Sequence, residues 1–118
     1  MNWLGVPNLA VLEKFLDLAA MRQTLVSTNL ANVDTPGYHT RDVDFRGELQ
    51  RAMDGAAQGA SSPFVVAVPG LLARPDGNNV SVDRESMLLA ETQLQFKAAT
   101  AILRAEFAKI HTAIREGQ

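Results

Sequence analysis

Cysteine is absent from this 118-residue chain. Its absence excludes disulfide scaffolds, thiolate metal sites and cysteine nucleophiles. Aromatic residues are also few: the chain has one Trp, one Tyr and five Phe. They provide little bulk for a deep core. No charge of one sign dominates: 11 basic and 13 acidic residues give a net charge of −2. This balance argues against a nucleic-acid binder, which needs a basic face.

Long hydrophobic runs are missing as well. No stretch approaches the ~20 apolar residues that span a bilayer, so we expect no direct membrane insertion. Residues 1–7 lack the basic segment and apolar core of a secretory signal, and export by the general secretory route is not expected. Hydrophobic residues nevertheless make up 47% of the chain, which is typical of a folded protein. With this length, we expect a single domain over 1–118.

The first long helix is predicted over residues 8–33, with Asn8 as its N-cap. Its large apolar side chains cover an arc much wider than the ~100° stripe that packs on one partner. The sequence Asp34-Thr35-Pro36-Gly37 ends the helix, because Pro36 excludes helical backbone before it and Pro-Gly favours a type II turn. This helix therefore has too much apolar surface for one packing partner.

The middle segment, residues 34–82, is predicted to be small and irregular. Apolar residues at i, i+4 spacing indicate a short helix over 45–53. The small polar residues of 54–63 predict a flexible loop. Two short apolar runs, 64–68 and 79–82, are predicted to pair as a β-hairpin.

The second long helix is predicted over residues 83–116, with Asp83 as its N-cap. It carries two candidate packing faces. One is a stripe of large apolar residues, which includes Leu89, Phe96, Leu103, Phe107 and Ile110; the other is a seam of small residues, which includes Ala98, Ala101 and Ala105. The predicted fold is mainly α, with two long terminal helices in an antiparallel hairpin or coiled coil. Because such a hairpin cannot bury all of this surface, either neighbouring subunits cover it or the termini are partly disordered in the monomer.

Candidate chemistry is sparse. His39, Asp42 and Asp44 could in principle contribute to a metal or acid–base site. The second histidine, His111, lies at the far end of the chain, and a zinc site needs three or four convergent ligands. We therefore interpret these residues as solvated turn residues and expect no enzyme activity, metal site or cofactor.

The most specific local pattern joins the end of the first helix to the turn after it. It reads Asn, apolar, small, Asn, two variable positions, Thr-Pro-Gly and an aromatic residue. This pattern resembles the N-terminal signature of the axial proteins of the bacterial flagellum, the family of rod and hook subunits. The matching residues are Asn29, Leu30, Ala31, Asn32, Thr35, Pro36, Gly37 and Tyr38. The two Asn amides are expected to bond carbonyls at the helix end or a neighbouring chain.

Residues 76–80, 82–85 with Met87, and 91–98 resemble the short proximal-rod members of this family. The resemblance implies a structural subunit of the proximal rod that self-assembles into the torque-transmitting shaft. The implied partners are copies of itself, other rod proteins, the membrane ring through an adapter, and the flagellar type III export apparatus. The implied location is the basal-body rod in the periplasmic space, reached without a cleaved signal peptide.

Two alternatives remain open from the sequence. Another short axial protein, either a sister proximal-rod subunit or a rod-to-ring adapter, would share the signature. A secretion-associated helical binding module would share the amphipathic helices without forming part of the rod.

Overall fold

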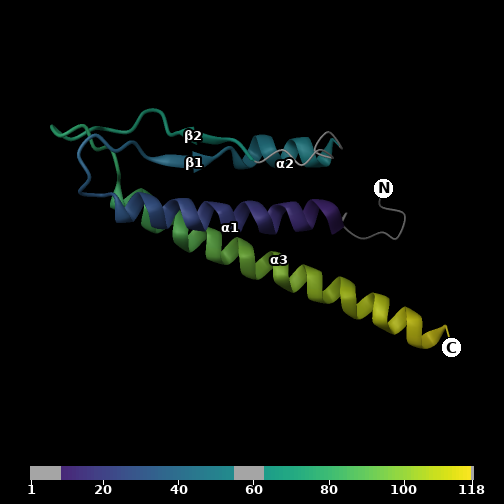
Figure 1. The fold of residues 1–118 in the computed structure, drawn as a ribbon. Helices are drawn as coiled ribbons and strands as arrows, with labels where there is room; N and C mark the ends of the chain where they lie inside the picture. Colours follow the sequence, from purple (N-terminus) through teal and green to yellow (C-terminus); the bar gives the residue numbers. More distant parts are fainter. Residues whose placement is uncertain (1–8, 55–62, 118) are drawn as a thin grey trace.

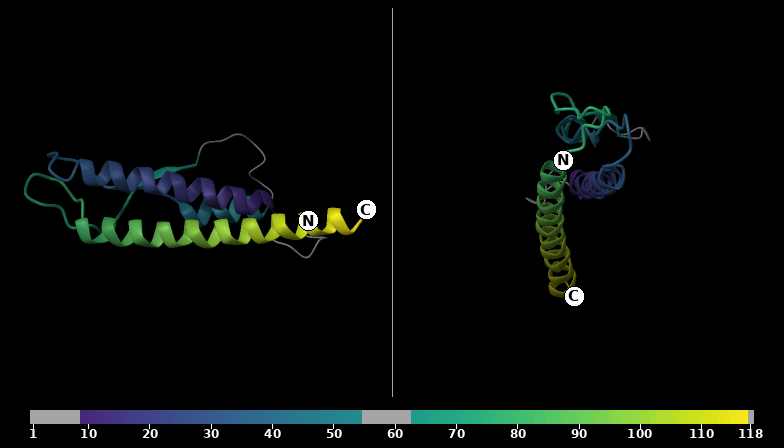
Figure 2. Two further views of the ribbon diagram at one scale, coloured as in Figure 1. Left: turned by 90° about the horizontal axis from the view of Figure 1, so that it is seen from below. Right: turned by 90° about the vertical axis from the view of Figure 1, so that its left-hand side faces the viewer.

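The computed structural model describes residues 9–54 and 63–117. Two long helices at the ends of the chain flank a short helix and a small sheet (Figure 1). In chain order the elements are α1 (Leu9–Ala31), β1 (Arg41–Val43), α2 (Phe45–Met53), β2 (Val65–Ala67) and α3 (Val82–Glu116). Helices α1 and α3 run in opposite directions side by side (Figure 2). The mainly α fold predicted from the sequence is therefore confirmed.

Helix α1 is the central layer of the molecule. It packs against α3 on one side and against β1 and α2 on the other. Leu18 and Ala19 are fully buried, and the ring of Phe15 meets that of Phe45 edge to face at 5.3 Å. The wide apolar arc of α1 therefore does need two partners. The second partner in this structure is the middle segment of the same chain.

Both long helices differ from the predicted ranges at their ends. Helix α1 ends at Ala31 because the N–H of Val33 bonds to the carbonyl of Leu30 in a tighter turn, at 3.2 Å. Helix α3 is capped by Ser81, whose hydroxyl accepts the N–H of Arg84 at 3.2 Å, so the prediction of Asp83 as the cap is wrong. Asp83 lies instead in the first turn, where the helix dipole favours an acidic side chain. The predicted cap Asn8 lies outside the described residues.

The middle segment confirms the short helix and corrects the sheet. Helix α2 has the predicted bounds, and the side chain of Asp44 caps it by accepting the N–H of Gly47 at 3.2 Å. Strand β2 falls within the predicted 64–68, but it pairs with β1, antiparallel with Val43 opposite Val65. The predicted hairpin with 79–82 is wrong, because the N–H of Asn79 bonds to the carbonyl of Tyr38 at 3.2 Å instead. Most of the predicted loop 54–63 lies outside the described residues.

Helix α3 extends well beyond α1. It has 35 residues against 23, so at ~1.5 Å per residue it is about 18 Å longer. The molecule is correspondingly elongated, with extents of 68 × 27 × 19 Å. Within the described ranges, neither long helix combines the length and hydropathy that a bilayer span requires.

Candidate functional site

The turn that follows α1 spans residues 35–38, and we call it the signature turn. It contains a glycine in the left-handed conformation. Gly37 has φ of 74°, and the N–H of Tyr38 bonds to the carbonyl of Thr35 across the turn at 3.2 Å, as a type II turn requires. The amide of Asn32 donates to the carbonyl of Thr28 at 2.8 Å and accepts the hydroxyl of Thr35 at 3.0 Å. Asn32 thus joins the last turn of the helix to the turn that follows it.

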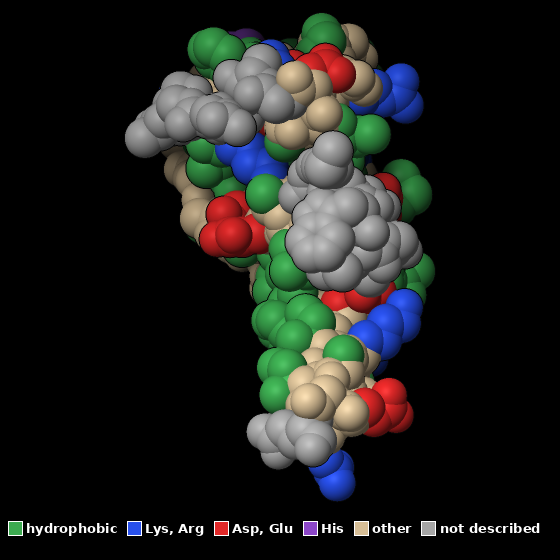
Figure 3. Space-filling view, turned by 90° about the vertical axis from the view of Figure 1, so that its right-hand side faces the viewer, with side chains coloured by type: hydrophobic (Ala, Val, Ile, Leu, Met, Phe, Trp, Pro, Cys, Tyr) green, Lys and Arg blue, Asp and Glu red, His purple; other side chains and the backbone are tan. Residues whose placement is uncertain are grey.

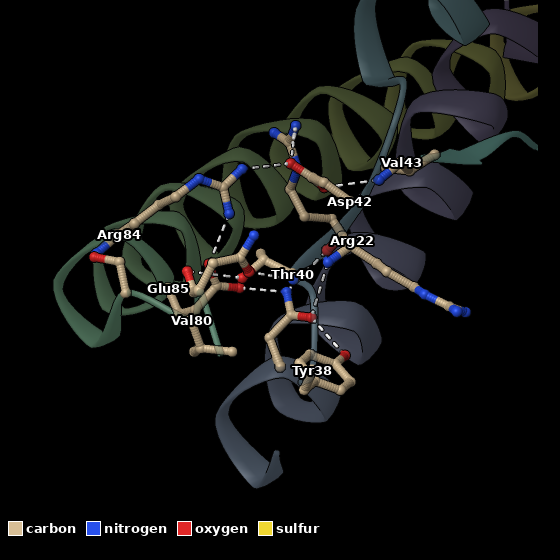
Figure 4. Close-up of polar contacts among 12 residues, drawn as sticks. Arg22, Tyr38, Thr40, Asp42, Val43, Val80, Arg84 and Glu85 are labelled. Atoms are coloured by element: carbon tan, nitrogen blue, oxygen red, sulfur yellow. Dashed lines mark hydrogen bonds and ion pairs between the residues drawn. The ribbon is translucent and has the colours of Figure 1, made fainter. Parts of the chain in front are cut away.

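Asn29 connects three elements through one side-chain amide. It is 1% exposed and donates to the carbonyl of Arg41 at 2.8 Å and to Glu85 Oε1 at 2.6 Å. Its oxygen accepts the Tyr38 hydroxyl at 2.8 Å and the N–H of Arg41 at 3.1 Å. All four bonding positions of the amide are therefore occupied. Through them α1 is joined to β1, to α3 and to the aromatic residue of the signature (Figure 4).

An ion-pair network continues from Asn29 across the molecule. Glu85, which is fully buried, accepts Arg84 Nη1 at 2.6 Å, and Arg84 Nη2 donates to Asp42 at 3.1 Å. Arg22 binds the same carboxylate in a bidentate manner: its Nε donates to Asp42 Oδ1 at 3.0 Å and its Nη2 donates to Oδ2 at 3.1 Å. Two carboxylates thus face two guanidinium groups, which offsets the cost of burying them. We call Asn29, Arg22, Asp42, Arg84 and Glu85 the polar cluster (Figure 4).

The interpretation of Asp42 as a solvated turn residue is therefore wrong. Its side chain belongs to the buried ion pairs, whereas Asp44 caps α2 and His39 approaches the amide of Asn79 at 3.4 Å. In the part of the chain that the structure describes, no three His, Asp or Glu side chains are grouped to hold a metal ion.

A second turn packs directly against the signature turn. The N–H of Gly37 bonds to the carbonyl of Asp76 at 2.9 Å, and the amide of Asn78 donates to the carbonyls of Asn32 and Thr35 at 2.8 Å each. Gly77 has φ of 87°, and a Cβ there would lie 3.4 Å from the Cα of Gly37. The two stretches that carry the family resemblance are therefore in backbone contact.

Five residues that join these elements had no predicted role: Asn78, Asn79, Arg84, Glu85 and Arg22. One signal for the first two was present: two adjacent asparagines beside a Gly turn are suited to bonding nearby backbone groups. For the charged residues there was no comparable signal, because their partners on other elements lie 20 to 56 positions away.

Glu48 fastens α2 to the rest of the fold. Its carboxylate forms ion pairs with Arg51 and, at 3.7 Å, with Lys14 of α1, and it accepts the N–H of Phe64 at 3.2 Å. Burial by itself would raise the pKa of the Glu48 carboxyl. The bond from Phe64 and the nearby positive charges outweigh burial, so the pKa lies below its ordinary value.

We expect Glu48→Gln to lower the free energy of unfolding at pH 7 by about 1–3 kcal/mol, because the charged hydrogen bonds are lost. A lowered folded-state pKa stabilises the fold above the unfolded-state pKa, and this contribution is lost as the pH falls through the folded value. The difference between wild type and variant should therefore shrink below about pH 4.3. Urea unfolding at several pH values measures it, with the exposed Glu13→Gln as control. Equal stabilities at pH 7 would contradict this role.

The predicted packing residues of α3 flank its buried contact with α1, and Leu103 and Phe107 border a small cavity together with Leu9 and Leu16 of α1. The buried face of α3 consists of Glu85, Thr92, Ala99 and Glu106, at seven-residue spacing. The predicted large residues are half-buried or exposed: Leu89 and Leu103 are half-buried, Phe96 is 41% exposed, Phe107 55% and Ile110 40%. The predicted small residues Ala98, Ala101 and Ala105 are all exposed. Much of both faces of α3 thus remains exposed, and hydrophobic side chains follow its extension (Figure 3).

Comparison with known proteins gives a consistent result. The chain is 30% identical to the flagellar basal body rod protein FlgB of Salmonella typhimurium, over 89% of this chain and 91% of that protein. It is 32% identical to FlgB of Cereibacter sphaeroides, over 91% and 93%. FlgB of Escherichia coli is 30% identical over 89% and 91%. No protein-family model matches the chain.

Proposed function

The chain belongs to the family of the flagellar basal body rod protein FlgB, and on this basis we propose that it is a structural subunit of the proximal rod. The observation that carries the proposal is the amount of apolar surface that α3 leaves exposed on its two predicted packing faces. A chain that packs its middle segment well yet leaves its longest helix exposed is suited to assembly with neighbours. The shared name of the relatives favours this member over a sister rod subunit, a rod-to-ring adapter or a secretion-associated binding module.

The fold suggests how such a subunit carries torque. The polar cluster and the two packed turns fix the angle between the two long helices at one end of the molecule. The exposed faces of α3 then bind neighbouring subunits, and repetition of one such contact builds a filament. Because this connection between the two long helices is rigid, torque is transmitted along the filament without bending each subunit there. The buried carboxylates support a structural role, because Asp42 and Glu85 are engaged by arginines.

The proposed partners follow from family membership. They are copies of the same chain, other rod proteins, and the membrane ring through an adapter. Delivery is proposed to use the flagellar type III export apparatus, without a cleaved signal peptide, to a basal-body rod in the periplasmic space. No catalytic step is proposed.

Purified basal bodies provide the test of this function. Cells that carry only a tagged, functional copy should swim, and the tagged protein should co-purify with their basal bodies. A strain lacking the gene should be non-motile and should recover motility with the tagged copy. Basal bodies that lack the protein in swimming cells would refute the proposal.

A seam variant tests how α3 contributes to assembly. Ala101→Leu should prevent close helix approach, because overpacking a tight contact costs ~1–3 kcal/mol. We expect loss of motility with near-normal export and with unchanged stability of the isolated chain. Ala113→Leu, an exposed alanine outside both faces, is the matched control and should swim normally. Normal swimming of Ala101→Leu would show that the seam faces solvent.

A further inference from the structure

Helix α1 exposes charges of one sign only. Its two basic residues, Lys14 and Arg22, are partly buried and form ion pairs with the middle segment. Its two acidic residues, Glu13 and Asp17, are exposed, and neither forms an ion pair with any described residue. Because they are four residues apart, they project from the same side of the helix. We call Glu13 and Asp17 the acidic pair.

The second half of α3 exposes the opposite charge. From residue 97 to residue 115 its exposed charged side chains are all basic: Lys97, Arg104, Lys109 and Arg115. The acidic residue in this range, Glu106, is buried. Lys97 and Arg104 form no ion pair with any described residue, and their seven-residue spacing places them on one side of the helix. We call Lys97 and Arg104 the basic pair.

Small residues surround both pairs. Ala20 and Thr24 continue the exposed side of α1 beyond the acidic pair, and the Thr24 hydroxyl already donates to the carbonyl of Ala20 at 3.2 Å. On α3, the exposed Ala101 lies between the two members of the basic pair. The distance between two packed helices depends on the size of the side chains at their contact. Here the small residues allow a close approach, within reach of the charged side chains.

The two pairs match in charge and in length. Two carboxylates opposite two basic groups leave no net charge at the contact. At ~1.5 Å per residue the acidic pair spans about 6 Å along its helix and the basic pair about 10 Å. The long, flexible stems of Lys and Arg cover the difference. Complementary charges of this kind fix the register of a contact and disfavour wrong partners.

We propose that the acidic pair on α1 of one copy packs against the basic pair on α3 of a second copy. The assignment of the partner as a second copy rests on the proposed function, and the chain itself carries both charges that the contact needs. The two pairs lie on different helices, so each copy still has one of them available after a single contact. A contact between two different surfaces can therefore repeat from copy to copy, as a filament requires.

Charge reversal tests this contact in cells that carry only the variant chain. Glu13→Lys/Asp17→Lys makes the acidic pair basic. Lys97→Glu/Arg104→Glu makes the basic pair acidic. Each change places like charges opposite one another, and we expect completed rods to fall at least about tenfold at near-normal amounts of secreted chain. All four substitutions together restore opposite charges and should restore rods and swimming. Normal rods in either reversed pair, or no recovery in the combined variant, would overturn the proposal.

Exposed charges outside both pairs provide matched controls. Arg46→Glu on α2 and Glu116→Lys at the end of α3 reverse one charge each and should assemble normally. Loss of rods in either control would overturn the proposal, because any charge reversal would then suffice. The urea midpoint of each purified variant should equal that of wild type, since the substituted side chains are exposed. If a reversed pair lowers it, the neutral Glu13→Gln/Asp17→Asn replaces that variant; it should also lower the number of rods, and normal rods would contradict the contact.

Cross-linking in isolated basal bodies separates this contact from the rod function. A carbodiimide joins a carboxylate directly to a lysine amine that touches it, so it should yield a dimer linked between the acidic pair and Lys97. Lys97→Arg keeps the charge but lacks the amine, and it should assemble without giving this product. Basal bodies that contain the chain but yield no such dimer refute the contact and leave the rod function standing. Linkage of Lys97 to a different rod protein would overturn the second copy as partner.

Discussion

Asn29→Ala is expected to lower the free energy of unfolding by about 3–5 kcal/mol, a large part of the 5–15 kcal/mol typical of a domain. The variant deprives the buried Glu85 carboxylate of a donor at 2.6 Å and leaves both backbone groups of Arg41 without their side-chain partner. The Tyr38 hydroxyl loses its acceptor as well. Unpaired buried groups each cost about 1–3 kcal/mol, which is why one truncation has so large an effect.

Urea unfolding followed by circular dichroism measures this loss. Asn29→Asp is the sharper variant, because it keeps the shape of the side chain but turns a carboxylate oxygen toward Glu85 and the carbonyl of Arg41. It should destabilise the chain at least as much as Ala at pH 7. Gln23→Ala, an exposed change on the same helix, should stay within about 0.5 kcal/mol of wild type. A small effect of both Asn29 variants would mean that water replaces the amide.

Gly37→Val is expected to abolish rod assembly while the subunit is still exported. At φ of 74° a Cβ would meet nothing within 4 Å, so the cost comes from the backbone and is about 1–3 kcal/mol. The chain can relieve this strain by leaving the left-handed region. It then breaks the bond from the Gly37 N–H to Asp76 and the close approach to Gly77. The start of α3 follows that second turn, so the relative direction of the long helices changes.

Basal bodies and secreted protein should be counted in cells that carry only the variant. We expect secreted subunit at near-normal amounts and no completed rods. Gly70→Val is the stability control in solution, because Gly70 has a similar φ of 80° and equally open surroundings but lies outside the two packed turns. Gly37→Val should be the less stable of the two. Normal rods with Val at position 37 would show that the packed turns do not set the assembly geometry.

Local patterns allowed much of the fold to be predicted. Apolar periodicity located both long helices, and the i, i+4 spacing within 45–53 gave α2 its observed bounds. The Pro-Gly pair placed the left-handed residue at Gly37. These features depend on neighbours within a few positions, which a single sequence displays directly.

Long-range pairings could not be predicted in the same way. Strands β1 and β2 have three residues each and are separated by α2, so neither carries enough alternation to identify its partner. Asp42 looked like an ordinary turn residue because nothing near it in sequence indicates Arg22 or Arg84. The face of α3 that packs on α1 was missed because it contains Glu85 and Glu106, and charged residues are rarely expected in a buried seam.

The position of Glu85 also determines when the chain can fold. Asn29 and Glu85 are 56 positions apart, and Asn78, which bonds the signature turn, is 46 positions beyond Asn32. Closing loops of this length costs conformational entropy, and local contacts within the helices do not compensate for it. A chain emerging from a ribosome or a narrow channel with its N-terminus first therefore lacks these bonds until its last third has appeared. During most of synthesis α1 and the turn after it therefore lack their hydrogen bonds to Glu85 and Asn78. These bonds form late, when the start of α3 has been made.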